Sequence, residues 1–276
     1  MKRFVALFLC MTMGISFGAL PVVAAPDPSP QITAASAINA AGRQRMLSQR
    51  IVKLYCQVGQ GVLLNKSRQQ LQESVALFDR QLKELKQFTP NPAVATAVAK
   101  MEGVWQPFKE LVSKNPSKED AKKLASMGED LLAAAHAATM ALQAHSGTAS
   151  GRLVNTSGRQ RMLSQRMAKL YMLKHWGVGV PDVELAQARQ EFKTAQSELE
   201  AAPENTPRIK QELGMVRVQW TYFETALSQE NEAAVNAANA AAGVRSEFSA
   251  NVATTSERIL EAMDSITALY EKLAVK

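Results

Sequence analysis

The sequence has few of the residues that build β-sheets, disulfides or metal sites. Its 276 residues include only two cysteines and three histidines. Valine and aromatic residues do not alternate with polar ones, and neither Asn-Gly nor Asp-Gly turns occur, so strands are not expected. Alanine, leucine, glutamine, lysine and glutamate dominate at helical spacing, which predicts an all-α protein.

The scarce chemistry-bearing residues argue against an enzyme or a metalloprotein. Cys10 lies in an apolar leader, which leaves Cys56 without a partner for an internal disulfide. His136, His145 and His175 are scattered and fit neither a haem attachment motif nor the spacing of zinc ligands. Catalytic triads, paired catalytic carboxylates and a phosphate-binding loop are also missing. We therefore expect no enzymatic activity, no metal and no cofactor.

The first residues have the pattern of a secretory signal peptide. Lys2 and Arg3 precede a long apolar run, and the small residues that end at Ala25 suit cleavage before Pro26. The prediction is a signal peptide over residues 1–25 and a soluble, periplasmic mature chain. A retained membrane anchor is the alternative, although the apolar run is short for a membrane span.

One block of sequence occurs twice. The nonapeptide GRQRMLSQR stands at Gly42–Arg50 and again at Gly158–Arg166, 116 residues later. Chance does not plausibly produce this match, so the chain contains an internal duplication. Outside the block the halves agree weakly, although Trp105 recurs as Trp220. A block kept intact in diverged halves indicates a role beyond packing, because packing tolerates hydrophobic exchange.

Helical periodicity and helix-breaking residues divide each half into four helices. The residues Asn115-Pro116-Ser117, for example, provide a turn and an N-cap. We expect two tandem antiparallel four-helix-bundle units, over residues 31–146 and 147–276. One long helix across Gly147 and Gly151 is the alternative at their junction. The expected helices are at roughly 33–64, 67–88, 93–112, 117–144, 153–176, 182–200, 207–228 and 232–273.

Positive charge is concentrated around the repeated block. The chain has a formal net charge of +7. Bases occur without a single acid between Pro28 and Gln72, and again between Leu131 and Pro181. These bases are interleaved with apolar helical positions in an exported chain, so we do not expect nucleic acid to be the partner.

On a helix, the middle one of the three arginines in each block lies on the same face as a glycine one turn earlier. Arg45 follows Gly42, and Arg161 follows Gly158. A buried guanidinium requires a partner, because desolvating it alone costs several kcal/mol. Either acids of other helices pair with these arginines, or the two arginines converge on a small anion through their planar forks. We favour the anion for this pair. The acids that would pair instead are Glu73, Asp79, Glu84, Glu102 and their counterparts in the second half.

The segment Ile38–Arg50 resembles the PilJ-like domain, the N-terminal sensor domain of type IV pilus methyl-accepting chemotaxis proteins. It is also similar to the periplasmic P-box of nitrate/nitrite sensor kinases, which reads I-N-x-A-G-x-x-R-M-x-S-x-R. The first copy matches every fixed position, and the second departs only at Val154 and Ser157. The motif covers about 13 residues of each half.

The resemblance implies a ligand and its site. In the kinases, nitrate lies between the P-box helices of two subunits and is held by the first arginine of each motif. One chain here carries both half-sites, so the site forms either within a monomer or across a homodimer. The ligand-binding residues implied by position are Arg45, Arg161, Gly42, Gly158, Arg50, Arg166, Asn39 and Asn155.

These features predict a periplasmic sensor-type protein that binds a small oxyanion, nitrate or nitrite first. Because the sequence carries no kinase or methyl-accepting region, we expect a membrane receptor or histidine kinase as its partner. The alternative is a non-enzymatic interaction or adaptor module for a chemoreceptor, pilus or envelope partner, in which the arginines are structural.

Overall fold

The computed structural model describes residues 32–236 and 242–274, apart from the side chains of residues 229–246. The predicted signal peptide and its cleavage site lie outside these residues. Within the described ranges the chain is all-α, with no strand, and none of its helices is long and apolar enough to span a membrane. The helices are α1 (Ala34–Gln60), α2 (Leu64–Gln87), α3 (Pro92–Val112), α4 (Lys118–Ser146), α5 (Ala149–His175), α6 (Asp182–Glu200), α7 (Pro207–Asn236) and α8 (Ala242–Ala274).

Local sequence signals account for most helix ends. The Asn91 side chain caps α3 by accepting from the backbone N–H of Val94 at 3.0 Å. Ser117 caps α4 in the same way, accepting from Asp120 at 3.1 Å. The expected turn between residues 228 and 232 is wrong, because α7 continues to Asn236 through glutamate and alanine, which are good helix formers. The connection from α7 to α8 lies in the undescribed residues 237–241.

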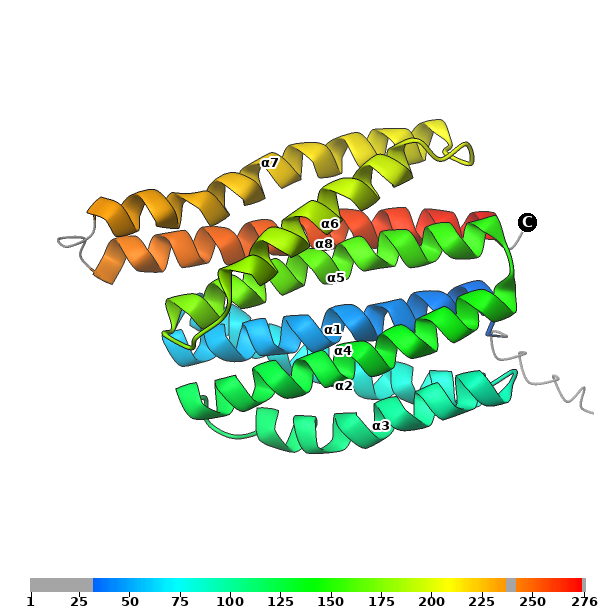
Figure 1. Ribbon diagram of the computed structural model, residues 1–276, viewed down its shortest axis with the longest axis horizontal. Helices are drawn as coiled ribbons and strands as arrows, with labels where there is room; N and C mark the ends of the chain where they lie inside the picture. Colours follow the sequence, from blue (N-terminus) through cyan, green and yellow to red (C-terminus); the bar gives the residue numbers. More distant parts are fainter. Residues whose placement is uncertain (1–31, 237–241, 275–276) are drawn as a thin grey trace, which may run out of the picture. The chain divides into compact units, whose positions relative to one another are not determined.

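The junction of the two halves is a tight turn. Gly147 ends α4 with a left-handed φ of 61°, which glycine adopts without steric cost. Thr148 then caps α5 by accepting from the N–H of Gly151 at 3.0 Å. The alternative of one continuous helix across this junction is therefore excluded. The turn sends α5 back alongside the first half (Figure 1).

The two motif helices are the contact between the halves. In the first unit α1 packs on α2 and α4, and α3 packs on α4. In the second unit α5 packs on α6 and α8, and α7 packs on α8. The most extensive helix pair in the described part of the chain is α1 with α5, which lie side by side in Figure 1. The fold is thus two tandem four-helix units joined along their motif helices.

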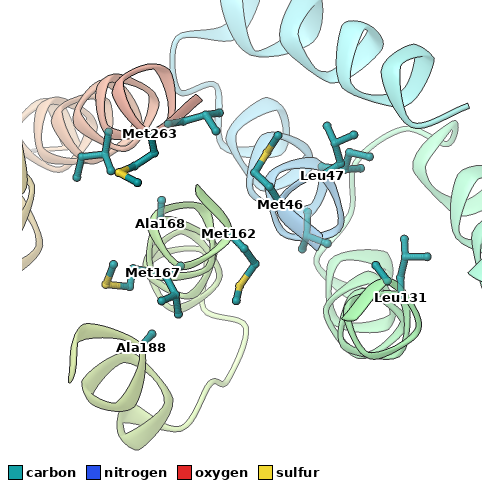
Figure 2. Close-up of a cluster of buried hydrophobic side chains, with 14 of the residues drawn as sticks. Met46, Leu47, Leu131, Met162, Met167, Ala168, Ala188 and Met263 are labelled. Atoms are coloured by element: carbon teal, nitrogen blue, oxygen red, sulfur yellow. The ribbon is translucent and has the colours of Figure 1, made fainter. Parts of the chain in front are cut away.

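The buried hydrophobic residues of both units form one contiguous cluster. Figure 2 shows part of it, with Met46 on α1 and its repeat counterpart Met162 on α5, together with Leu131 from α4 and Met263 from α8. Because this cluster crosses from one unit to the other, burial of apolar surface holds the two motif helices together.

Each unit also has an aromatic anchor of its own. Trp105 of α3 stacks on Phe78 of α2, with ring centroids 3.8 Å apart. Trp220 of α7 stacks on Phe192 of α6 at 4.3 Å, in the equivalent place. Trp105 and Trp220 therefore have the same structural role, which identifies α3 and α7 as equivalent helices of the two units.

A glycine near the end of α1 gives a test of this packing. A Cβ atom at Gly59 would lie 2.2 Å from a ring carbon of Trp176, which follows α5, whereas a Cβ at Gly103 meets nothing within 4 Å. We expect Gly59→Ala to destabilise the protein by about 1–3 kcal/mol through overpacking. Gly103→Ala, in the interior of α3, is expected to stabilise it by about 0.5–1 kcal/mol. Thermal or denaturant unfolding measures both, and equal stability of the two variants would contradict the α1–α5 packing.

Candidate functional site

Most polar residues in and just after the repeated block lie inside the protein. Both copies bury the same positions. In α1 the buried polar side chains are those of Gln44, Arg45, Ser48, Gln49 and Lys53, and in α5 those of Gln160, Arg161, Ser164, Gln165 and Lys169. Buried polar groups need partners, so the structure must supply a partner for each of them.

The motif glutamines have structural partners. Gln44 donates to the carbonyl oxygen of Phe78 at 3.2 Å, and Gln160 donates to the carbonyl of Phe192 at 3.0 Å. These bonds tie α1 to α2 and α5 to α6. The repetition of this glutamine therefore has a structural explanation.

The second glutamine of each copy reaches the last helix of its own unit. Gln49 donates to the carbonyl oxygen of Gly128 at 3.3 Å, and Gln165 donates to that of Ser256 at 3.0 Å. Gly128 of α4 and Ser256 of α8 are thus equivalent positions in the two units.

Lys53 and Lys169, each three residues after a copy of the repeated block, bind carboxylates of the opposite unit. Lys53 of α1 lies 2.5 Å from a carboxylate oxygen of Glu257 in α8, and it also donates to Gln165 of α5 at 2.7 Å. Arg50 binds the other oxygen of Glu257 at 2.6 Å. Burial disfavours ionisation of Glu257, but Lys53 and Arg50 outweigh it and lower the pKa of this carboxyl to about 2.

The same ion pairs recur in the opposite direction. Lys169 of α5 lies 2.5 Å from Glu129 of α4, and Arg166 lies 2.9 Å from the same carboxylate. Arg166 also approaches Glu184 at 3.4 Å. Glu129 and Glu257 directly follow the equivalent residues Gly128 and Ser256, so they too occupy matching positions. The motif positions that the resemblance assigned to ligand support, Arg50 and Arg166, are here engaged with carboxylates of the opposite unit.

Two of the acids expected from the sequence to pair with the motif arginines pair with lysines instead, so that expectation is wrong for them. Asp79 pairs with Lys109 at 2.6 Å, and Glu102 pairs with Lys86 at 2.7 Å. Arg50 and Arg166 bind Glu257 and Glu129 of the opposite half, because α1 and α5 pack against one another and bring α4 and α8 within reach of both motifs. Arg161 binds Asp264 of its own half.

Arg161 has an internal counter-ion. Its side chain is fully buried, and it pairs with the carboxylate of Asp264, which also binds Arg43 at 2.9 Å. Its Nη2 donates to Oδ1 of Asn39 at 2.8 Å. Burial disfavours the charged form of Asp264, but Arg161 and Arg43 outweigh it and hold the pKa of this carboxyl below its usual range.

Arg45 has no such counter-ion among the described residues. Its side chain is only 1% exposed, and its Nη2 donates to the carbonyl oxygen of Asn155 at 3.1 Å. Its Nη1 lies 3.4 Å from Nδ1 of His136, and its Nε has no hydrogen-bond partner. Burial, followed by the charges of Arg161 and Arg159, lowers the pKa of Arg45 to about 9. The guanidinium is therefore protonated at neutral pH and carries an uncompensated buried charge.

The two arginines converge over the two motif glycines. A Cβ atom at Gly42 would lie 3.3 Å from Nη2 of Arg45 and 3.5 Å from Nη2 of Arg161. A Cβ at Gly158 would lie 3.1 Å from Nη2 of Arg161 and 3.5 Å from that of Arg45. The structure thus brings together Gly42, Gly158, Arg45 and Arg161 with the backbone of Asn39 and Asn155, six of the eight residues predicted for the site.

A groove leads to Arg45. It has a volume of about 430 Å³ between α4, α5 and α6, and its lining includes Arg45, His136, Asn155, Arg152 and Arg159. Arg159 pairs across it with Glu191 at 2.7 Å. No group of His, Cys, Asp or Glu side chains in the described residues is placed to hold a metal ion. The chemistry of this site is therefore that of cationic and amide donors around a small space.

Sequence reasoning missed four residues at this site, which are His136, Asp264, Glu129 and Glu257. All four lie on α4 or α8, far from the motif in sequence. One signal was present: the spacing of Glu129 and His136 equals that of Glu257 and Asp264, seven residues in each case. That signal acquires meaning only when α4 is aligned with α8.

The sequence matches the PilJ family, described as Type IV pili methyl-accepting chemotaxis transducer N-term, over residues 31–130 and 142–246. These segments cover more than half of the chain and each contains one copy of the motif, so the protein belongs to this family. Comparisons with curated proteins and with solved structures find no match.

The buried ion pairs between the units give a prediction about stability. Glu257→Gln leaves Lys53 and Arg50 without their carboxylate, and we expect it to cost on the order of 3 kcal/mol of unfolding free energy at pH 7. Because the folded-state pKa of Glu257 is depressed to about 2, this contribution is present above the unfolded pKa of about 4.5 and is lost as the pH falls towards 2.

Denaturant unfolding between pH 7 and pH 2 measures this difference. The matched control is Glu102→Gln, which removes the exposed pair with Lys86 and should cost less than about 1 kcal/mol. A cost for Glu257→Gln as small as that of the control, or one that does not shrink on acidification, would contradict the assigned role of Glu257.

Proposed function

We propose that this PilJ-family protein is a periplasmic sensory-type protein that binds a small oxyanion, nitrate or nitrite first, between α1 and α5. The proposed binding groups are the guanidiniums of Arg45 and Arg161, and the proposed supporting residues are Gly42, Gly158, Asn39, Asn155, Arg50 and Arg166.

The convergence of two buried guanidiniums with a single carboxylate is the observation that carries this proposal. Asp264 pairs with Arg161, whereas Arg45 has only neutral partners among the described residues. Two like charges in a water-poor space repel one another strongly. A bound anion would cancel the excess charge and accept hydrogen bonds from both forks.

The charge balance favours an anion at Arg45. Asp264 is shared between Arg161 and Arg43, so Arg45 is the guanidinium of this cluster that has no carboxylate contact among the described residues. Nitrate and nitrite are small and carry one negative charge over several acceptor oxygens. Sulfate would bring a second charge that needs further donors in a buried space, which makes it a discriminating control.

The context of the site fits sensing rather than catalysis. The apolar leader of the sequence supports export to the periplasm, and the matching family consists of N-terminal parts of chemotaxis transducers. We therefore propose a membrane receptor or a histidine kinase as the partner that responds to the bound state.

Calorimetric titration of the chain from residue 26 with nitrate and nitrite at low salt tests the site, with chloride and sulfate for comparison. We expect saturable binding, and a loss of affinity of about 30-fold or more for Arg45→Ala and for Arg161→Ala. Lys66→Ala removes an exposed base of α2 and should bind as the unchanged protein does.

The stoichiometry also reports the assembly. One anion per chain supports a site formed within a monomer, whereas one per two chains places it between protomers. Unchanged affinity in both arginine variants, with folding verified by circular dichroism, would refute the site. Absence of binding to every anion in the unchanged protein would refute the function.

A second candidate function, an interaction module, is favoured by an apolar stripe on α7. Met215, Val218 and Tyr222 are 55%, 54% and 59% exposed. When α3 is aligned with α7 on their tryptophans, the first unit carries Lys100, Gly103 and Pro107 at these positions. The fold itself therefore does not require large apolar residues there.

The proposed occupant of this stripe is α7 of a second copy. Around this stripe, the residues of α7 that follow one another at helical spacing form a seam without charged side chains. Two copies can therefore meet along the seam without burying a charge. In an antiparallel pair centred on Val218, the small Gly214 would face the large Tyr222 of the other copy, which suits close packing. The seam consists of Gln211, Gly214, Met215, Val218, Thr221, Tyr222 and Thr225.

Sedimentation equilibrium tests the self-association. We expect the unchanged protein to dimerise with rising concentration, and Tyr222→Lys to remain monomeric because it places a charge in the seam. Val183→Lys alters another exposed valine, on α6, and should dimerise normally. A monomeric unchanged protein would overturn the assignment and leave the stripe to a helix of a different protein.

A further inference from the structure

The two halves of the candidate site differ in charge at one pair of equivalent positions. Glu129 and Glu257 occupy matching places on α4 and α8. Glu257 binds Lys53 and Arg50, and Glu129 binds the equivalent Lys169 and Arg166. Two helical turns further on, α4 carries His136 and α8 carries Asp264. His136 contacts Arg45, and Asp264 contacts Arg161.

The next pair along the two helices shows the same trend. Seven residues after His136 and Asp264 stand Gln143 and Glu271. Gln143 accepts from the side chain of Asn155, and Glu271 accepts from the equivalent Asn39 at 2.5 Å. Along this face α8 therefore presents three carboxylates, whereas α4 presents one carboxylate, one imidazole and one amide.

His136 supplies contact without charge. Its imidazole is exposed on one side and faces Arg45 through Nδ1, which lies 3.4 Å from Nη1 of the guanidinium. Burial and the charges of Arg45 and Arg159 lower its pKa, so the ring is neutral at pH 7. A neutral nitrogen can accept from the guanidinium, but it leaves the positive charge of Arg45 in place.

We infer that His136 keeps the half-site at Arg45 open for an external anion, whereas Asp264 fills the equivalent half-site at Arg161 from within the chain. This inference rests on the proposed function and deepens it, because it makes the two arginines unequal. Arg45 is the receiving group, and Arg161 is a group that already has its counter-ion.

The groove gives the anion its route. It runs between α4, α5 and α6 and is lined by Arg45 and His136 together with two further arginines of α5, Arg152 and Arg159. Arg159 pairs with Glu191 of α6, and Glu198 of α6 also lines the groove. The three arginines of the lining therefore exceed its two glutamates by one positive charge. A positively lined groove raises the local concentration of anions.

Exchange of the histidine for the residue found in the other half gives a sharp test. His136→Asp places a carboxylate beside Arg45, as Asp264 is placed beside Arg161. We expect the variant to lose about tenfold or more in nitrate affinity, because the internal carboxylate takes the place of the ligand. Its Tm should rise by about 2–4 °C, because the buried charge gains a partner.

His136→Asn is the matched control. It has nearly the same size and shape as the aspartate variant but carries no charge, so its nitrate affinity should be clearly higher than that of His136→Asp. The reciprocal variant Asp264→Asn releases Arg161 and should bind nitrate at least as tightly as the unchanged protein. All are measured by calorimetric titration of the chain from residue 26 and by thermal unfolding.

The outcomes separate this inference from the proposed function. Nitrate binding that is equal in the unchanged protein and in His136→Asp would refute the role of His136 while leaving the anion site standing. A lower Tm for His136→Asp than for His136→Asn would also refute it, since the new carboxylate would then fail to pair with Arg45. Absence of nitrate binding in the unchanged protein would instead refute the proposed function.

Discussion

The structure depends on the compensation of positive charge buried between α1 and α5. Each of these two helices has a lysine and an arginine whose side chains are almost completely buried in this contact. Such charges are tolerated only when carboxylates or other acceptors lie within reach. The main carboxylates come from α8 for Lys53 and from α4 for Lys169, that is, from the opposite unit in each case. Separating the units would leave these charges unpaired, so electrostatics and apolar burial both favour the joined arrangement.

The helices could be predicted from the sequence because their ends are fixed by local chemistry. Pro92, Ser117 and Gly147 act on their own neighbours, and the apolar periodicity of each helix is visible in a short window. The end of α7 was misplaced because no capping residue or breaker marks it. The repeated motif likewise pointed to Arg45 and Arg161 directly, since its residues are contiguous.

The charge partners of the motif could not be predicted in the same way. Glu257 lies more than 200 residues from Lys53 in the chain, and the contact exists only because α1 pairs with α5. The sequence pointed to acids on neighbouring helices as the partners. Asp79 illustrates the error, because its carboxylate binds Lys109 and Trp105 instead. Long-range pairing decides which acids meet which bases, and helical periodicity does not encode it.

The internal duplication separates structural from functional roles. Where both halves keep the same contact, as Gln44 and Gln160 do with a carbonyl of the following helix, the contact belongs to the fold. Where the halves differ at equivalent positions, as at His136 and Asp264, the fold tolerates either residue, and another cause is needed for the difference. The unequal charge of these two positions thus carries more information about function than the repeated motif itself.

A site with one filled and one open half has a consequence for signalling. A ligand shifts a conformational equilibrium only by the difference between its affinities for the two states. On the proposed function, Arg161 keeps its bonds to Asp264 and Asn39 whether or not the anion is present. Arg45, in contrast, gains a counter-ion when the anion binds. The largest energetic change on binding then falls on α1 and on α4, the helix that holds His136. A partner that distinguishes the two states would therefore gain most by contacting the first unit, on the side of α4.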